Sequence, residues 1–388
     1  MKDKKPLSFA IVLLFFNAIA FCAPLYSPTW GFSIDLPEGY QFTGGDKRDR
    51  FSFEHPSGAK FDIIIYPAAQ YPSTEELAID VNRRLNSSGG MDSFEYRDKE
   101  ICILELAFTN QGAGGRTAPM EGWAVCTELG KARQASETAP RPLLLAMAYG
   151  PKGRDELMGL HFSALDSLAP EESDKLAPGI ITEFSYPRET SESANVFGFD
   201  INAVIYREDA EAAQALIDRE FQVLRLYENA PDWKEAWIRF YRAIYRDSFD
   251  RLSDIAFQVE RKLNVPALES RELADKALQW VQSFEYERDF AGSDFQNLVT
   301  AATEGRGDCD SRAMLWAIIL KQADIPSAIM VSRQYSHAMG LADLPGPGAR
   351  FELEGQKLLV AETTAKVSIG LIGETVSDIE GWIGVAFE

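Results

Sequence analysis

Short apolar runs separated by turn residues dominate the chain from residue 27 to residue 169. Such runs favour strands, and they occur at residues 30–36, 51–54, 60–66, 94–96, 102–108, 121–126 and 143–149. One helix is predicted between residues 74 and 89, because Ser73 and Glu76 have the spacing of a capping box and apolar residues follow at helical spacing. The pattern predicts an α+β domain built on an antiparallel sheet over residues 27–169.

The pattern changes after residue 169. Residues 171–195 are rich in proline, serine and charge and lack a sustained period, which is typical of a linker. Apolar residues at helical spacing then predict helices over residues 210–227, 233–263 and 271–284. Trp237, Phe240 and Tyr241 lie in the second of these helices, and we interpret them as a stripe that faces the core.

A glycine-rich turn leads into the last predicted helix. The run GRGDC at residues 305–309 precedes a helix over residues 310–322, which must end before Pro326 because proline disfavours helical backbone in the residue before it. The Arg-Gly-Asp tripeptide in this run is explained by the turn and by helix capping. Strands follow at residues 327–332, 335–339, 350–353 and 357–361. Residues 196–388 therefore form a second α+β domain with a helical N-terminal segment.

Three residues of this second domain have the chemistry of a nucleophilic site. Cys309 is expected at a helix start, where free N–H groups and the helix dipole favour a thiolate. Of the three histidines, only His337 follows Cys309; His55 and His161 are interpreted as structural. Glu362 ends the last predicted strand, where a carboxylate can hold the imidazole of His337 in one tautomer. Glu362 could instead be a solvated residue at a strand end.

The order of cysteine, helix, strand, histidine, strand and acid resembles the transglutaminase-like superfamily, a papain-related α+β fold. The resemblance rests on GDCDSRA around Cys309, SHAM around His337 and VAETTA around Glu362, and it covers roughly residues 233–388. It implies that Cys309 is the nucleophile, His337 the general base and acid, and Glu362 the orienting acid. The family more often has aspartate followed by Pro-Thr in the third position.

This constellation implies acyl transfer on a protein or peptide substrate through a thioester. Water as the second substrate gives a peptidase or amidase, and a primary amine gives a protein-crosslinking transglutaminase. Hydrolysis is favoured because many exported bacterial members of the superfamily look hydrolytic, and a non-catalytic binding module is the competing hypothesis. The backbone N–H of Cys309 is the expected oxyanion donor, with the side chain of Gln296 as an alternative. No cofactor or metal is expected, since cysteine and histidine do not occur at zinc spacing near the site.

Two features of the first forty residues indicate export to the periplasm or the medium. Residues 1–20 begin with lysines, continue with an apolar run too short for a comfortable membrane span, and end in a small-x-small cleavage site. The alternatives are an uncleaved anchor and a lipoprotein signal that uses Cys22, which would allow peripheral membrane association. Residues 31–40, GFSIDLPEGY, resemble the opening of the PsbP-like fold of exported bacterial proteins.

Net charge limits the classes of partner, and cysteine content raises the question of a disulfide. A formal net charge of −20 argues against nucleic acid or anionic lipid as a partner held by charge. Cys102 and Cys126 lie in two strand-like runs, and in an oxidising compartment they could pair. We predict this disulfide, with two buried free thiols as the alternative.

Overall fold

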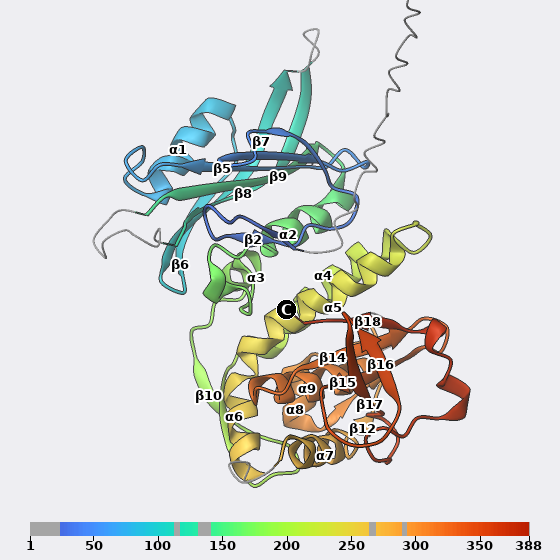
Figure 1. The fold of residues 1–388 in the computed structure, drawn as a ribbon. Coiled ribbons are helices and arrows are strands. Elements are labelled where there is room, and N and C mark those ends of the chain that lie inside the picture. The colour runs from blue at the N-terminus through green and yellow to red at the C-terminus, as the bar shows by residue number, and fades with distance from the viewer. Residues whose placement is uncertain (1–23, 112–116, 131–140, 264–268, 289–292, 388) are drawn as a thin grey trace, which may run out of the picture.

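The computed structural model describes residues 24–111, 117–130, 141–263, 269–288 and 293–387, and two large antiparallel sheets organise them (Figure 1). This arrangement confirms the α+β class. Residues 1–20 and Cys22, with the predicted signal, lie outside the described residues. In the part of the chain that the structure describes, no helix is long and apolar enough to cross a membrane. We call residues 24–185 the N-terminal unit and residues 191–387 the C-terminal unit.

The N-terminal unit contains a seven-stranded sheet in the order β3-β4-β5-β9-β8-β7-β6. The strands are β3 (Gln41–Gly45), β4 (Arg50–Glu54), β5 (Lys60–Tyr66), β6 (Met91–Tyr96), β7 (Lys99–Gln111), β8 (Thr117–Glu128) and β9 (Leu143–Pro151). The predicted opening strand at residues 30–36 is wrong in length, because only β2 (Ser33–Ile34) pairs, with β1 (Leu25–Tyr26). The sequence also missed β3, which contains Gly44 and Gly45 and lacks strand propensity there.

Helices cover both faces of this sheet. Helix α1 (Thr74–Leu85) begins where predicted, since the Ser73 side chain accepts a hydrogen bond from the N–H of Glu76. It packs Leu77 and Val81 against one face. The other face is covered by α2 (Met158–Asp166) after the short turn η1 (Asp155–Leu157), and by residues of the C-terminal unit.

The predicted linker is more ordered than its composition indicates. Residues 171–195 contain η2 (Glu172–Asp174), α3 (Ile180–Ser185) and β10 (Ser191–Asn195), which pairs with β11 (Asn202–Tyr206). Ile180 is fully buried in the core of the N-terminal unit. Elements of three to six residues are too short to produce the periodicity on which the linker interpretation relied.

The C-terminal unit packs helices against a five-stranded sheet in the order β16-β17-β15-β14-β18. Its helices are α4 (Asp209–Arg225), α5 (Trp233–Arg251), α6 (Ser253–Lys262), α7 (Ser270–Val281), α8 (Leu298–Glu304) and α9 (Cys309–Gln322). The strands of its sheet are β14 (Ser327–Ser332), β15 (His337–Ala342), β16 (Arg350–Leu353), β17 (Gln356–Ala361) and β18 (Ile383–Val385). A small parallel pair, β12 (Glu285–Tyr286) and β13 (Arg306–Gly307), and two 3-10 helices, η4 (Glu374–Val376) and η5 (Ile379–Gly381), complete the unit. The single helix predicted over residues 233–263 is wrong: it breaks at Leu252, which is fully buried between α5 and α6.

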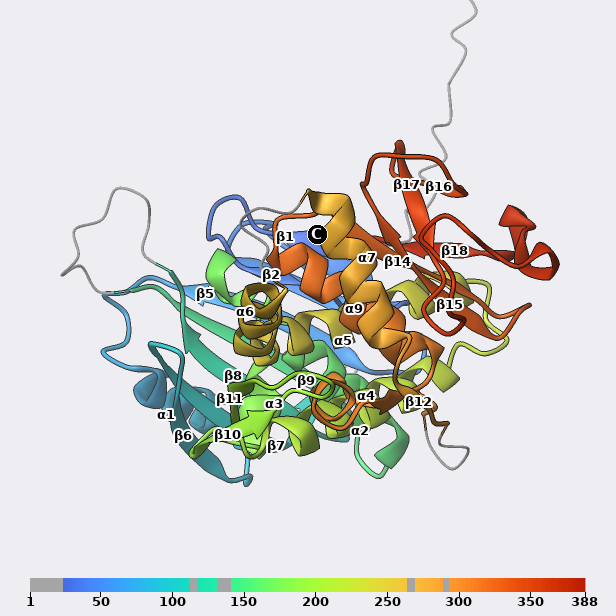
Figure 2. The same ribbon diagram turned by 90° about the horizontal axis from the view of Figure 1, so that it is seen from below.

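Helix α9 is the central element of this unit. Every residue from Ser311 to Leu320 is buried, so the helix is enclosed on all sides and has no solvent face. It contacts β14 and β15 as well as α6, α7 and α8, which surround it in Figures 1 and 2. The apolar face expected from the sequence is therefore only part of what this helix buries.

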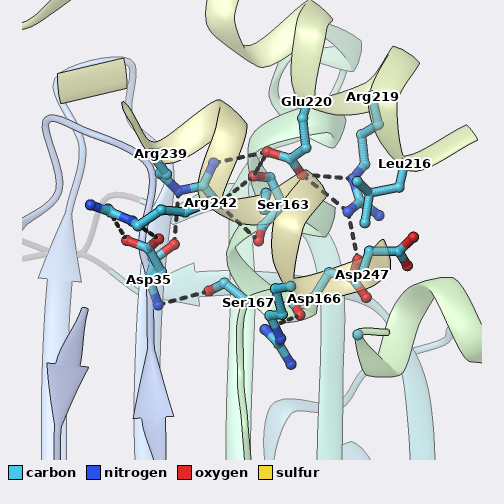
Figure 3. Close-up of a pocket in the computed structure, with 13 residues that line it drawn as sticks. Asp35, Ser163, Asp166, Ser167, Leu216, Arg219, Glu220, Arg239, Arg242 and Asp247 are labelled. Atoms are coloured by element: carbon cyan, nitrogen blue, oxygen red, sulfur yellow. Dashed lines mark hydrogen bonds and ion pairs between the residues drawn. The ribbon is translucent and has the colours of Figure 1, made fainter. Parts of the chain in front are cut away.

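The two units meet at a buried network of charged side chains (Figure 3). Arg239 of α5 donates to the Glu220 carboxylate and to the Ser163 hydroxyl, each at 2.8 Å. Arg219 of α4 donates to the Asp166 carboxylate of α2 at 2.6 Å. The remaining cavity is only about 40 Å³. Because these charges are paired, we interpret the network as the contact that holds α4 and α5 against the N-terminal unit.

Cys102 and Cys126 face one another across β7 and β8, both fully buried and both free thiols. The predicted disulfide is therefore wrong, and the alternative of two buried thiols agrees with the structure. Directly opposed residues of an antiparallel pair have Cβ atoms about 4.5–5.5 Å apart, whereas a disulfide needs about 3.8 Å. Both side chains pack as apolar groups under α1.

Candidate active site

The turn before α9 fixes the position of Cys309. Gly305 ends α8 in a left-handed conformation with φ +68°, where an added Cβ would lie 2.2 Å from the Phe197 ring. Only glycine fits there without displacing that ring. Asp308 then caps α9, accepting a hydrogen bond of 2.8 Å from the N–H of Ser311. Cys309 is consequently the first residue of α9, one position earlier than predicted.

The surroundings of Cys309 do not favour a resting thiolate. The side chain is 5% exposed, and its sulfur lies 3.8 Å from Oδ2 of Asp310. Burial raises the pKa of the Cys309 thiol, and the carboxyls of Asp310 and Asp308 raise it further. The N–H of Ala338 and the guanidinium of Arg288 act in the opposite direction, with a smaller effect. Burial and the two carboxyls therefore oppose the thiolate that the helix start is expected to favour.

His337 begins β15 directly after a tight turn. Ser336 has φ +48°, and His337 pairs with Ser332 at the end of β14. Its Nε2 lies 2.8 Å from Oε2 of Glu362. Since an ionised carboxylate can only accept, Nε2–H is the donor and Nδ1 is the unprotonated nitrogen of the neutral ring. Nδ1 has no hydrogen-bond partner among the described residues, so it is available as a base.

Glu362 follows the last residue of β17 and is held at both carboxylate oxygens. Its Oε1 accepts from the N–H and the hydroxyl of Thr364, at 2.8 and 2.5 Å. Burial raises the pKa of Glu362, but the bond and charge of His337 and the bonds from Thr364 outweigh it and lower the pKa to about 2. Gln282 donates to the backbone oxygens of Glu362 and Val367, which fixes this end of the strand. Glu362 is thus a buried, paired carboxylate, and a solvated strand end does not describe it.

The three predicted residues come from a helix start, a strand start and a strand end of neighbouring elements. The sulfur of Cys309 lies against the N–H of Ala338, the residue that follows His337. The side chain of Asp310 also interacts electrostatically with His337. Cys309 therefore lies beside Ala338, the second residue of β15, and the carboxylate of Glu362 is bonded to the imidazole of His337.

Sequence reasoning missed two residues beside Cys309. The Tyr241 hydroxyl donates to Oδ1 of Asp310 at 2.8 Å, and both residues line a cleft of about 320 Å³ together with His337. Trp237 and Phe240 line it too, so the aromatic stripe of α5 contributes to this cleft as well as to the core. Asp310 stood within the GDCDSRA run and could have been singled out as an acid next to the cysteine.

Gln296 is held through its amide oxygen and its backbone N–H. Its Oε1 accepts a bond of 3.4 Å from Arg306, and its backbone N–H donates to Ser311. The N–H of Cys309, at the open end of α9, has no hydrogen-bond partner within the described ranges. The backbone N–H of Cys309 is therefore free to donate, as an oxyanion site requires.

The other two histidines lie in the N-terminal unit. His55 follows β4, and its Nδ1 lies 2.7 Å from the hydroxyl of Ser57. His161 lies in α2, and burial lowers its pKa to about 4. No group of three or more His, Cys, Asp or Glu side chains is placed to hold a metal ion in the residues that the structure describes.

Comparison with known proteins gives matches among solved structures. No family model matches the chain, and no curated protein matches it. One similar solved structure, from Bacteroides thetaiotaomicron VPI-5482, is 13% identical with a TM-score of 0.25 and covers 57% of this chain and 76% of its own. Another, a "putative protease" from Parabacteroides distasonis ATCC 8503, is 8% identical with a TM-score of 0.21 and covers 82% of this chain and 68% of its own. At these TM-scores neither likeness carries an argument about this protein.

Proposed function

We propose that this protein is a transglutaminase-like cysteine enzyme that hydrolyses amide bonds in proteins or peptides through a thioester. The observation that supports the proposal is the placement of Cys309 beside the start of β15, where Glu362 holds the imidazole of His337. A buried thiol, a base with a free nitrogen and a carboxylate that orients the base are the parts that nucleophilic acyl transfer requires.

The reaction begins from the neutral thiol. His337 accepts the thiol proton at Nδ1 as the sulfur attacks the carbonyl carbon, and the Glu362 carboxylate stabilises the imidazolium that forms. The N–H of Cys309 donates to the oxyanion. The imidazolium then protonates the leaving amine, and a thioester remains on Cys309. Water, deprotonated by the same imidazole, attacks the thioester and releases the carboxylic acid and the thiol.

The test is turnover of a denatured protein substrate by the full chain and by Cys309→Ala. We expect new peptide termini with the parent protein and none with the variant, while Cys102→Ala, which removes a buried thiol far from His337, keeps the activity. Mass spectrometry of the acid-quenched parent should show an acyl adduct on Cys309. Turnover by pure Cys309→Ala would remove this cysteine from the reaction. Added primary amine separates the outcomes, since incorporation of the amine would indicate transamidation.

We also propose export, on the basis of residues 1–20. The mature protein purified from its source should begin at Phe21. A lipid-modified Cys22 at the N-terminus would instead support the lipoprotein signal and a peripheral membrane location. A chain that still begins at Met1 outside a membrane anchor would contradict both.

A further inference from the structure

The cleft beside His337 is a groove with two unlike walls. Helices α4 and α5 form the first wall with the apolar side chains of Phe221, Leu224, Trp237 and Phe240. The turn between β14 and β15, residues 332–337, forms the second wall. Helices α4 and α5 precede the cysteine-helix core in the sequence, so the segment in front of that core shapes the space next to the reacting groups.

The first wall leaves apolar surface uncovered. Phe221, Leu224 and Trp237 are only partly buried although each lines the groove. Phe295 and Tyr241 are buried and add aromatic surface. Partly exposed apolar side chains gathered in a concavity of this size are typical of a site for an apolar ligand.

Two sets of contacts relate the groove to its surroundings. Arg333 donates to the backbone oxygen of Glu228 at 3.2 Å, and its guanidinium lies 5.6 Å from the centre of the Trp233 ring. These contacts join the β14–β15 turn to the α4–α5 connection. His337 and Asp310 also line the groove, and Asp310 contacts the sulfur of Cys309. A side chain in the groove would therefore belong to a residue close to the attacked carbonyl.

The charged groups that line the groove are already engaged. Asp310 accepts from Tyr241, Asp294 is paired with Arg288, and Arg333 binds the α4–α5 connection. A charged substrate side chain would compete with these hydrogen-bond partners and would lose its own water on entering a groove lined by aromatic side chains. An apolar side chain gains from leaving water and loses nothing of this kind.

We propose that this groove binds the side chain on the acyl side of the attacked amide and selects a large apolar or aromatic one. The inference rests on the proposed function, because it assigns the substrate class of that same site. Discrimination between a large apolar side chain and alanine should be about tenfold or more, the range that apolar pockets achieve.

The experiment uses acetylated dipeptides that carry a chloromethyl ketone in place of the scissile amide. Attack by Cys309 forms a thioether, releases chloride and leaves the thiol proton on the base or the buffer. The residue next to the ketone is Phe, Leu, Ala, Lys or Asp, and intact-mass spectrometry follows the rate of labelling. We expect the Phe and Leu reagents to label Cys309 roughly tenfold or more faster than the other three.

A variant with changed preference distinguishes the groove from general reactivity. Phe221→Glu should slow the Phe reagent about tenfold and accelerate the Lys reagent, a gain that a misfolded protein cannot show. The matched control is Phe257→Ala, because Phe257 is 53% exposed on α6 and does not line the groove. It should leave all five rates unchanged.

The outcomes separate this inference from the proposed function. Labelling of Cys309 at equal rates by all five reagents, or faster labelling by Lys or Asp, would overturn the groove assignment and leave the nucleophile in place. Unchanged preference in folded Phe221→Glu would also overturn it. Failure of every reagent to label Cys309 of the parent would overturn both proposals.

Discussion

The imidazole of His337 and the carboxylate of Glu362 are joined by a hydrogen bond of 2.8 Å, although the residues are 25 positions apart in the chain. They come from β15 and from the end of β17, which are adjacent strands. Because the strand register and the bond from Gln282 fix both ends, the imidazole is held before any substrate arrives. The ring orientation is thus a property of the sheet.

Glu362→Gln should weaken catalysis without removing the nucleophile. The amide keeps the shape but loses the charge that stabilises the imidazolium, so we expect turnover to fall by roughly one to three decades. Glu362→Asp should be milder and His337→Ala more severe. Turnover on one amide substrate measures this, with Glu352→Gln on the exposed side of β16 as control. A folded Glu362→Gln variant with full activity would show that Glu362 does not orient the base.

Asp310→Asn should make Cys309 more reactive toward iodoacetamide at neutral pH. After burial, the Asp310 carboxyl is the largest influence that raises the pKa of the Cys309 thiol, and the variant removes its charge. Labelling at pH 7 should become roughly tenfold or more faster, and its pH profile should move to lower pH. The control is Asp324→Asn, just beyond the C-terminal end of α9. An unmoved profile would mean that Asp310 does not act on the sulfur.

His161 should make the protein less stable in mild acid. Burial lowers its pKa from the ordinary 6.5 to about 4, and Nε2 is buried without a partner. Between pH 6.5 and pH 4 the unfolded chain therefore binds more protons than the folded protein. The free energy of unfolding is highest above pH 6.5 and falls by about 3 kcal/mol as the pH drops toward 4. His161→Asn cannot titrate, and urea unfolding at pH 7 and pH 4.5 should show a smaller loss. An equal loss in both proteins would exclude His161 as its source.

Arg239→Met should destabilise the protein by about 3 kcal/mol, because it leaves Glu220 buried with one ion-pair partner fewer. Arg207→Met is the matched control, since Arg207 and its partner Glu192 are 68% and 45% exposed and such pairs contribute about 0–1 kcal/mol. Urea unfolding followed by tryptophan fluorescence compares the two. Equal effects would contradict a structural role for the network in Figure 3.

Local rules explain most of what the sequence predicted correctly. A capping residue and a proline bound the helix before Pro326, and a run of apolar residues marks the strand at residues 327–332. Each of these signals lies within a few positions of the element that it bounds. The start of the next strand came within two residues of His337. These local boundaries already placed the cysteine, the histidine and the acid on the correct elements.

Properties that depend on distant packing were not predictable in this way. Tyr241 and Asp310 are 69 positions apart, and no local pattern joins them. The direction of the Cys309 pKa depends on how deeply the completed fold encloses the sulfur. Whether Cys102 and Cys126 form a disulfide likewise depends on the spacing of two paired strands, and the number of cysteines in the sequence does not give that spacing.

Helices α4 and α5 have two neighbours at once. Val223 and Ala236 belong to the core of the N-terminal unit, while Phe221 and Trp237 on the same helices line the groove beside His337. Expression of the C-terminal unit alone would expose the apolar side of both helices that packs on the N-terminal unit, and this exposed surface would promote aggregation. Substitutions that reshape the N-terminal sheet should shift α4 and α5, and with them the apolar wall of the groove. They would therefore change substrate preference, and the two units should evolve together.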